Sequence, residues 1–167
     1  MSAGAHPALS AIALQQGEGE ALWFLDALAI VKAGGEATGG RFAVVEILAP
    51  QGHGTPLHVH RREDEWFYVL EGHLTLWVGG QRIEAPAGSF AYAPRDIPHT
   101  FTVASPRARF LVGAEPSGFD EFIRSLSTPA QTRTLPPSTF QPPSPERMAA
   151  AAAQHGIEIL GPPGIPT

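Results

Sequence analysis

Short apolar runs, broken every few residues by turn-forming glycine or proline, fill the chain from residue 20 to residue 113. Such runs are typical of β-strands joined by tight turns. The pair Gly79-Gly80, which stands between two of them, is a strong hairpin signal. No helix-length periodic segment interrupts the stretch, so the sequence predicts an all-β domain. The predicted strands are Ala21–Asp26, Leu28–Lys32, Arg41–Leu48, Leu57–His60, Glu65–Leu70, Leu74–Val78, Gln81–Ala85, Phe90–Ala93, His99–Val103 and Arg109–Val112.

The pattern changes after Gly113. Ser117 and Asp120 have the spacing of a capping box, and they predict a short helix that carries an apolar stripe and ends at Leu126. Residues 128–145 are rich in proline, threonine and serine, so we expect an extended linker there.

A second helix is predicted to begin after Ser144, because a serine, a proline and a glutamate follow one another there as N-cap, first helical residue and early acid. It continues through an alanine tract to His155, and Gly156 ends it. We expect Ile157–Leu160 to dock on the barrel or on a partner chain. The expected organisation is an N-terminal segment at 1–19, a β-barrel at 20–114 and a helical, proline-rich extension at 115–167.

Composition excludes several classes of protein. The 167 residues, 43% apolar and 16% charged, are enough for one globular domain. A net charge of -5 without a basic run argues against nucleic acid as a partner. No apolar stretch is long enough for a membrane span, and the first residues do not resemble a signal peptide, so a cytoplasmic location is expected. The chain has no cysteine, so any metal must bind to nitrogen and oxygen atoms.

The densest chemical signal is the pair His58 and His60, followed by Glu65. Alternate residues of a strand point to the same face, so the two imidazoles can share one ion. The polar residues 61–64 form a plausible turn, after which a new strand brings Glu65 back to the inner face together with Phe67 and Val69.

A fourth ligand is expected from His99, which follows the turn-forming residues 94–98 at the start of a strand. Three imidazoles and one carboxylate suit one divalent transition metal (Ni, Co, Mn, Fe or Zn) and do not suit calcium or magnesium. Four protein ligands leave open positions on an ion that takes five or six, which favours a catalytic metal over a closed structural site.

These residues resemble the cupin superfamily. Gly52-x5-His58-x-His60-x4-Glu65-x6-Gly72 matches its first motif at every defined position. The second motif is met in part by Gly88-x5-Pro94 and His99, whereas Asp96 and Val103 replace the glycine and the asparagine of the pattern. Neither departure falls on a metal ligand. The resemblance implies a double-stranded β-helix, or jelly-roll barrel, followed here by short C-terminal helices.

A narrower resemblance rests on Glu18-Gly-Glu-Ala-Leu-Trp-Phe24, Thr38-Gly-Gly40, Phe67-Tyr-Val-Leu-Glu-Gly72 and Gly156-Ile-Glu-Ile-Leu-Gly161. These segments look like those of bacterial monocupins described as quercetin 2,3-dioxygenase-like. The resemblance implies that O2 is used to open a flavonol-like aromatic substrate with loss of carbon monoxide. Glu65 would then be both a ligand and the candidate catalytic base, although a carboxylate near a cation is a weak base.

Other interpretations stay open at this point. The same metal site could serve an isomerase, a lyase or a decarboxylase, in which the metal is a Lewis acid and no oxygen is consumed. The chain could also be a small-molecule binder without enzymatic activity. We further expect a homodimer, because small barrels with terminal extensions often pair edge strands between chains.

Five aromatic residues are candidates for lining a pocket for an aromatic substrate, although aromatics on strands are often plain core. They are Phe42, Phe67, Tyr92, Phe101 and Phe110. The remaining histidines lack the context of the motif and are interpreted as surface residues, with a place at the rim of the site considered for one of them, His53. They are His6, His53, His73 and His155.

Overall fold

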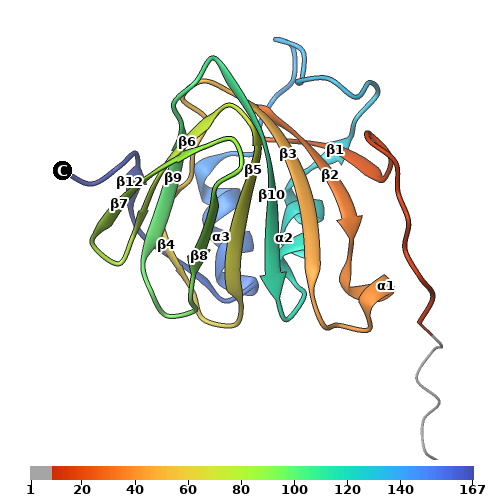
Figure 1. The fold of residues 1–167 in the computed structure, drawn as a ribbon, viewed down its shortest axis with the longest axis horizontal. Coiled ribbons are helices and arrows are strands. Elements are labelled where there is room, and N and C mark those ends of the chain that lie inside the picture. Colours follow the sequence, from red (N-terminus) through yellow and green to blue (C-terminus); the bar gives the residue numbers. More distant parts are fainter. Residues whose placement is uncertain (1–8) are drawn as a thin grey trace, which may run out of the picture.

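Two antiparallel β-sheets build the computed structural model, which describes residues 9–167 (Figure 1). The first sheet has the strand order β11 (Thr128–Pro129), β1 (Glu20–Phe24), β2 (Ala27–Ala33), β3 (Ala43–Pro50), β10 (Arg107–Glu115), β5 (Asp64–Glu71) and β8 (Phe90–Ala93). The second sheet has the order β12 (Ile157–Pro163), β4 (Pro56–His60), β9 (His99–Val103), β6 (His73–Val78) and β7 (Gln81–Pro86). This arrangement confirms the predicted all-β jelly-roll barrel.

Every strand predicted from the sequence is present, with ends that differ by a few residues. The hairpin signal is confirmed as well, since Gly79 and Gly80 have φ of 56° and 91° and join β6 to β7. The structure adds β12, in which Ile157 pairs with His60 and Ile159 pairs with His58. The C-terminal segment therefore docks on the barrel, directly beside the strand that carries two of the candidate ligands.

Strand β5 shows why the register of the barrel matters for the site. Glu65, Phe67 and Val69 are buried on its inner face, as the alternation of the sequence predicts. Trp66 and Tyr68 point to the outer face, and Trp66 lies opposite Gly113 of β10. A shift of the register by one residue would exchange the two faces and remove Glu65 from the interior.

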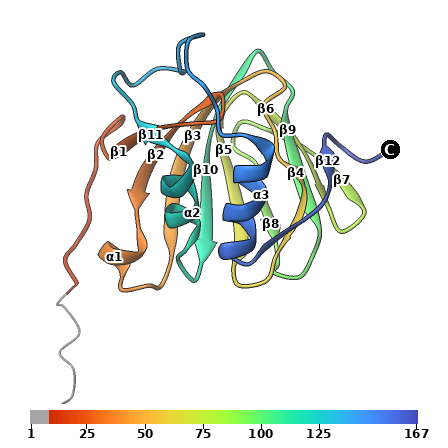
Figure 2. The ribbon, with the colours of Figure 1, turned by 180° about the vertical axis from the view of Figure 1, so that it is seen from behind.

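Three helices complete the fold: α1 (Gly35–Thr38), α2 (Phe119–Leu126) and α3 (Pro145–Gln154). Seen from behind, α2 and α3 lie side by side across the sheets (Figure 2). The predicted start of α3 is confirmed, because Ser144 Oγ accepts a hydrogen bond from the Arg147 N–H at 3.2 Å. Phe122, Ile123 and Leu126 form the buried stripe of α2 and join the main core.

The predicted capping box of α2 is wrong. Gly118, not Ser117, is the N-cap, and no side chain caps the helix there. The Asp120 carboxylate instead accepts a hydrogen bond from the Gly35 N–H at 3.0 Å and one from Arg124 at 2.7 Å. Asp120 is only 1% exposed, so it ties α2 to the start of α1, a long-range contact that local sequence spacing does not reveal.

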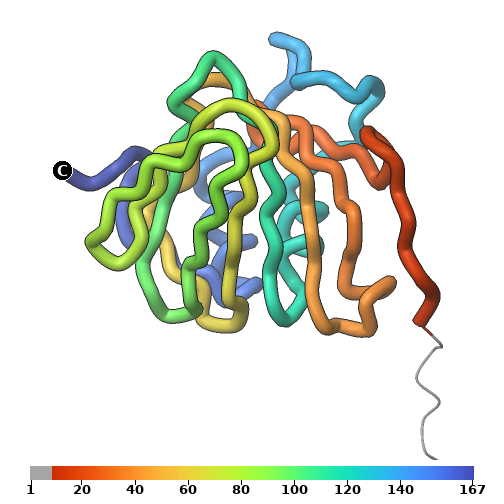
Figure 3. Tube along the Cα trace, in the orientation of Figure 1, coloured from red at the N-terminus to blue at the C-terminus, as the bar shows by residue number. Residues whose placement is uncertain are grey.

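The N-terminal segment from residue 9 to residue 19 runs along the outside of the barrel beside β2 and α1 (Figure 3). Residues 1–8 of the predicted N-terminal segment lie outside the described residues. Within residues 9–167, none of the helices combines the length and the apolar character that crossing a bilayer requires.

We predict that Gly113→Ala destabilises the barrel by about 1–3 kcal/mol, the usual range for an overpacked core. A Cβ atom at this position would overlap the Trp66 ring, which lies across the glycine on the neighbouring strand. Urea unfolding followed by tryptophan fluorescence measures the change. The matched control is Gly161→Ala, whose new Cβ would meet Leu57 Cβ at an ordinary 3.5 Å. Equal stability of the two variants would contradict the packing described here.

Candidate metal centre

Four buried side chains from both sheets meet in the interior of the barrel. They are His58, His60, Glu65 and His99, whose ligand atoms all lie within 4.8 Å of one another. The three histidines come from β4 and β9, where His58 and His99 are cross-strand partners. Glu65 comes from β5 in the other sheet, after the chain has crossed between the sheets at residues 61–63. The structure thus brings together the complete set of ligands that the sequence analysis singled out.

Hydrogen bonds at the outer edges of the imidazoles orient their inner nitrogens. His58 Nδ1 donates to the Pro56 carbonyl at 2.8 Å, and His99 Nδ1 donates to the Ile97 carbonyl at 2.9 Å, because a carbonyl oxygen can only accept. His60 Nδ1 lies 3.3 Å from the Glu63 carboxylate. Each of the three rings therefore has Nε2 available for a metal, which is the usual arrangement of metal-binding histidines.

The approach of His99 to Glu65 tests whether a metal fits this site. His99 Nε2 lies 2.7 Å from a Glu65 carboxylate oxygen, and His60 Nε2 lies 3.5 Å from the same oxygen. With Nδ1 of His99 donating outward, a neutral ring offers a lone pair at Nε2, which would face the lone pairs of the carboxylate. A cation between these atoms, either a proton or a metal ion, is needed to make the contact favourable. Three imidazole nitrogens and one carboxylate fit a divalent transition metal.

Burial and mutual proximity shift the pKa values of these groups in different directions. Burial, together with the nearby His99, lowers the pKa of His58 to about 4. Burial alone would lower the pKa of His60, but the carboxylates of Glu65 and Glu63 outweigh it and raise that pKa. Burial would raise the pKa of Glu65, but the surrounding imidazoles hold it at about 2. At neutral pH the Glu65 carboxylate is therefore ionised, and His58 is an uncharged imidazole that can bind a metal ion through its lone pair.

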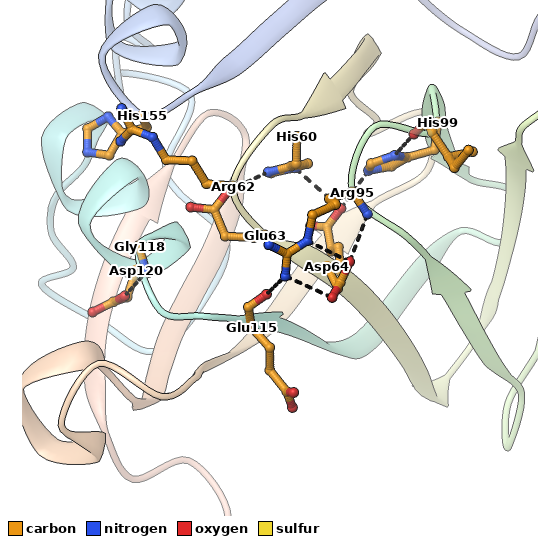
Figure 4. A network of polar contacts seen from close by, with 12 residues as sticks. His60, Arg62, Glu63, Asp64, Arg95, His99, Glu115, Gly118, Asp120 and His155 are labelled. Atoms are coloured by element: carbon orange, nitrogen blue, oxygen red, sulfur yellow. Dashed lines mark hydrogen bonds and ion pairs between the residues drawn. The ribbon is translucent and has the colours of Figure 1, made fainter.

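Glu63 is a buried neighbour of the candidate ligands that the sequence analysis did not single out. It lies in the turn between β4 and β5, yet it is only 4% exposed. One carboxylate oxygen faces His60 Nδ1, and the other lies against Gly118 at the start of α2 (Figure 4). From the sequence alone, Glu63 is interpreted as a solvated turn residue, because it stands in a polar run directly after the strand that carries His58 and His60. In the structure Glu63 is enclosed between His60 and Gly118 at the start of α2.

The departure from the second cupin motif at Asp96 leaves the loop before His99 intact. Asp96 has φ of 64°, in the left-handed region where glycine is favoured and where aspartate is tolerated better than most residues. The Ile97 N–H donates to the Pro94 carbonyl at 3.2 Å, and the Asp96 N–H donates to the His60 carbonyl at 2.8 Å. Aspartate thus takes the turn conformation of the missing glycine and attaches the loop to β4.

A cavity with mostly apolar walls opens onto the candidate ligands His58, His60 and Glu65. Both sheets and the C-terminal helices contribute to its lining. The apolar side chains at its wall include Phe24, Ile47, Phe101, Phe119, Phe122 and Met148. Such a cavity with a few convergent polar groups is typical of a small-molecule site.

Only Phe101 of the five aromatic candidates lines this cavity, and the prediction for the other four is corrected. Phe67 and Phe110 are 2% and 0% exposed and lie in the core behind Phe101. Tyr92 is 50% exposed, because its parity on β8 turns it to the outer face. Phe42 is 37% exposed and precedes β3 at a different surface. Aromatic residues of α2 and of β1 line the cavity in their place.

The interpretation of His53 as a surface residue is wrong, because the structure buries it. The alternative position at the rim of the site is closer to the observed place, since His53 lines the cavity. The residue is 6% exposed, and its side chain pairs through Nδ1 with the Asp26 carboxylate. His73 is partly exposed and pairs with Glu84 on the surface, and His155 is partly buried next to Phe122. His6 lies outside the described residues.

Comparisons with known proteins agree with this geometry. Residues 44–112 match the family model described as a cupin domain. The chain is 33% identical over 147 residues to a quercetin 2,3-dioxygenase of Bacillus subtilis strain 168, in an alignment that covers 88% of the chain and 44% of that protein. It is 27% identical over 110 residues to a quercetin 2,3-dioxygenase of Aspergillus japonicus, covering 62% of the chain and 31% of that protein. The chain therefore spans less than half the length of either relative.

A solved structure agrees on the fold. The RmlC-like cupin of Shewanella frigidimarina NCIMB 400 superposes with a TM-score of 0.56 at 18% identity, over 64% of this chain and 93% of that one.

We predict that the affinity for a divalent metal falls as the pH falls. The pKa of His60 lies above its ordinary value, so a proton competes with the metal for this ring before it competes for His58 or Glu65. Below the pKa of His60 the apparent affinity should drop by about tenfold per pH unit. Competition between Ni²⁺ and a chelator of known affinity measures it. An affinity that does not change between about pH 8 and about pH 6 would argue against His60 as a ligand.

We predict that Glu63→Gln weakens metal binding at high pH by about 10–100-fold, the usual effect of removing an outer partner of a metal-bound histidine. The same variant removes one of the two carboxylates that raise the pKa of His60. The pH at which metal affinity begins to fall should therefore be lower than in the wild type. The matched control is Glu121→Gln, an exposed position on α2 whose carboxylate makes no ion pair among the described residues. If both variants bind Ni²⁺ as tightly as the wild type, Glu63 does not support the site.

Proposed function

The chain belongs to the cupin superfamily, and from this premise we propose that it is a metal-dependent dioxygenase that cleaves a flavonol-like aromatic substrate. One observation carries the proposal. A buried three-histidine, one-glutamate cluster opens into an apolar cavity, within a chain that is 33% identical to a quercetin 2,3-dioxygenase over 88% of its length. The fold alone would not support a particular reaction, because one barrel can host many chemistries.

His58, His60 and His99 would hold the metal through Nε2, and Glu65 would hold it through its carboxylate. The ion, which we propose to be Ni, Co, Mn, Fe or Zn, supplies Lewis-acid stabilisation of a substrate oxyanion when it is bound. The outer hydrogen bonds of the three rings keep them in place, so that little reorganisation is needed when the substrate binds.

The cavity wall would orient the substrate and exclude water from the reacting atoms. Phe101, Phe119 and Phe122 present aromatic rings to the cavity, and such rings pack well against planar aromatic ligands. Because the wall is largely apolar, it favours entry of an aromatic substrate and of O2. The low polarity also strengthens every electrostatic contact near the ligands.

Glu65, a proposed ligand, is also the candidate catalytic base of the sequence analysis, and its environment limits that second role. A carboxylate with a pKa of about 2 has little tendency to take a proton from a weakly acidic hydroxyl. Glu65 could act as a base only after moving away from the imidazoles that lower its pKa, 2.7 Å away at His99. Its contribution as a ligand does not require this movement.

We predict that the purified protein contains a transition metal by elemental analysis and consumes oxygen with quercetin, releasing carbon monoxide. Chelation should abolish the oxygen uptake, and returning the metal should restore it. His99→Ala should lose the metal and at least about 100-fold of the rate, because it removes a ligand from a buried site. His73→Ala, which alters a partly exposed imidazole outside the cavity, is the matched control.

The same experiment separates the other reaction classes. Conversion of a substrate without oxygen uptake would favour an isomerase, a lyase or a decarboxylase over the dioxygenase. Tight binding of quercetin without a product, whichever metal is supplied, would favour a binding protein. The homodimer expected from the sequence stays a prediction, and light scattering measures it.

A further inference from the structure

A second ionisable pair, His53 and Asp26, lies at the wall of the cavity outside the candidate metal ligands, and of the two only His53 lines the cavity. His53 is 6% exposed and shares the cavity wall with His58, His60 and Glu65. Its Nδ1 pairs with the Asp26 carboxylate, whose side chain is 60% exposed. Among the described residues that line the cavity, His53 is the titratable side chain that the metal centre leaves unused.

The backbone on both sides of this pair is held firmly. The Val103 N–H donates to the His53 carbonyl at 2.8 Å, and the His53 N–H donates to the Pro50 carbonyl at 3.1 Å. At Gly54 a side chain would collide with the backbone of Phe101, so the loop lies flat against β9. His53 is therefore a preorganised group and not a mobile rim residue.

Asp26 is presented by the tight turn between β1 and β2. The preceding residue, Leu25, has φ of 56°, which is rare for a bulky side chain. This conformation places Leu25 at the cavity wall and Asp26 next to His53. Unusual backbone conformations of this kind persist where the surrounding structure maintains them, and they are concentrated at functional sites.

The pairing with Asp26 decides which nitrogen of His53 can accept a proton from a bound molecule. A carboxylate on Nδ1 keeps the proton there and leaves Nε2 as the acceptor, and it also stabilises the imidazolium that forms when Nε2 takes a proton. Within residues 9–167, the His53 side chain makes its hydrogen bond through Nδ1, and Nε2 has no partner. Every fully enclosed polar side-chain atom in that part of the chain does have a partner. Nε2 is therefore not fully enclosed, and it belongs to a side chain that lines the cavity.

We propose that His53, oriented by Asp26, is the catalytic base that takes the proton of the acidic hydroxyl of the substrate. This inference rests on the proposed function and assigns to His53 the role that Glu65 is poorly suited to fill. The O–H bond of the substrate breaks, its electron pair stays on the oxygen, and the proton forms an N–H bond at His53 Nε2. The dyad becomes an imidazolium–carboxylate pair, and the proton leaves to water after the product departs.

The test uses 3-hydroxyflavone, whose single acidic hydroxyl gives a longer-wavelength absorption band when it is ionised. The metal-loaded protein is mixed with this probe without oxygen, at a pH where the free probe is neutral. We expect the wild type to show the band of the anion, and His53→Gln to bind the probe without that band. With oxygen, the turnover number of His53→Gln should fall by about 10²–10⁴-fold at unchanged metal content.

Two further variants keep the test decisive. Asp26→Asn changes an exposed carboxylate in a turn, so it tests the dyad even if His53→Gln does not fold, and it should lower the turnover number by at least about tenfold. His73→Gln is the matched control, because His73 also pairs with a carboxylate, Glu84 at 2.8 Å, but on the surface.

The outcomes separate the two proposals. An anion band and a turnover number equal to the wild type in both His53→Gln and Asp26→Asn would overturn the role of His53 and leave the dioxygenase intact. A wild-type protein that neither binds the probe nor consumes oxygen with it would overturn both proposals. Loss of the band in the two dyad variants, but not in His73→Gln, is the result we expect.

Discussion

The contact between Glu65 and the imidazole of His99 organises the interior of this protein. Glu65 belongs to the seven-stranded sheet and His99 to the five-stranded sheet, and their facing atoms lie 2.7 Å apart. Because His99 already donates its Nδ1 proton to a backbone carbonyl, the contact is favourable only when a positive charge lies between the two groups. A buried carboxylate and three buried imidazoles are costly to desolvate, and a bound cation would offset that cost. The metal centre would then also connect the two sheets.

Much of the remaining structure can be understood as support for this contact. β12 pairs with β4 and fixes the strand that carries His58 and His60. α2 covers the turn after β4, so that Glu63 is buried against His60. The same helix supplies Phe119 and Phe122 to the cavity wall. The C-terminal extension therefore contributes to the geometry and the low polarity of the site.

The strands and the ligand set could be predicted from the sequence because they depend on local signals. Alternation within β4 and β5 decides which side chains face inward, and the turn residues 61–64 explain why Glu65 returns to the inner face. The docking of Ile157–Leu160 on the barrel was one of two predicted possibilities, and pairing with β4 decides between them.

The features that could not be predicted depend on contacts between distant segments. Tyr92 points outward because of its parity in a four-residue edge strand, which the sequence alone does not define. The enclosure of Glu63 involves Gly118 at the start of α2, and the burial of His53 requires the β1–β2 turn to bring Asp26 beside it. For the same reason, the bond of the Asp120 carboxylate to the Gly35 N–H of α1, which it makes in addition to its bond to the Gly118 N–H, could not be predicted.

X-ray absorption spectroscopy of the metal-loaded protein tests the central claim most directly, because it reports which atoms bind the ion without requiring a substrate. We expect scattering from three imidazole rings and from a carboxylate oxygen at about 2.0–2.2 Å in the Zn²⁺-loaded protein. A coordination shell built from fewer imidazoles, or one that is unchanged when Glu65 and His99 are both replaced, would show that the ion binds elsewhere and would contradict the four-ligand metal centre.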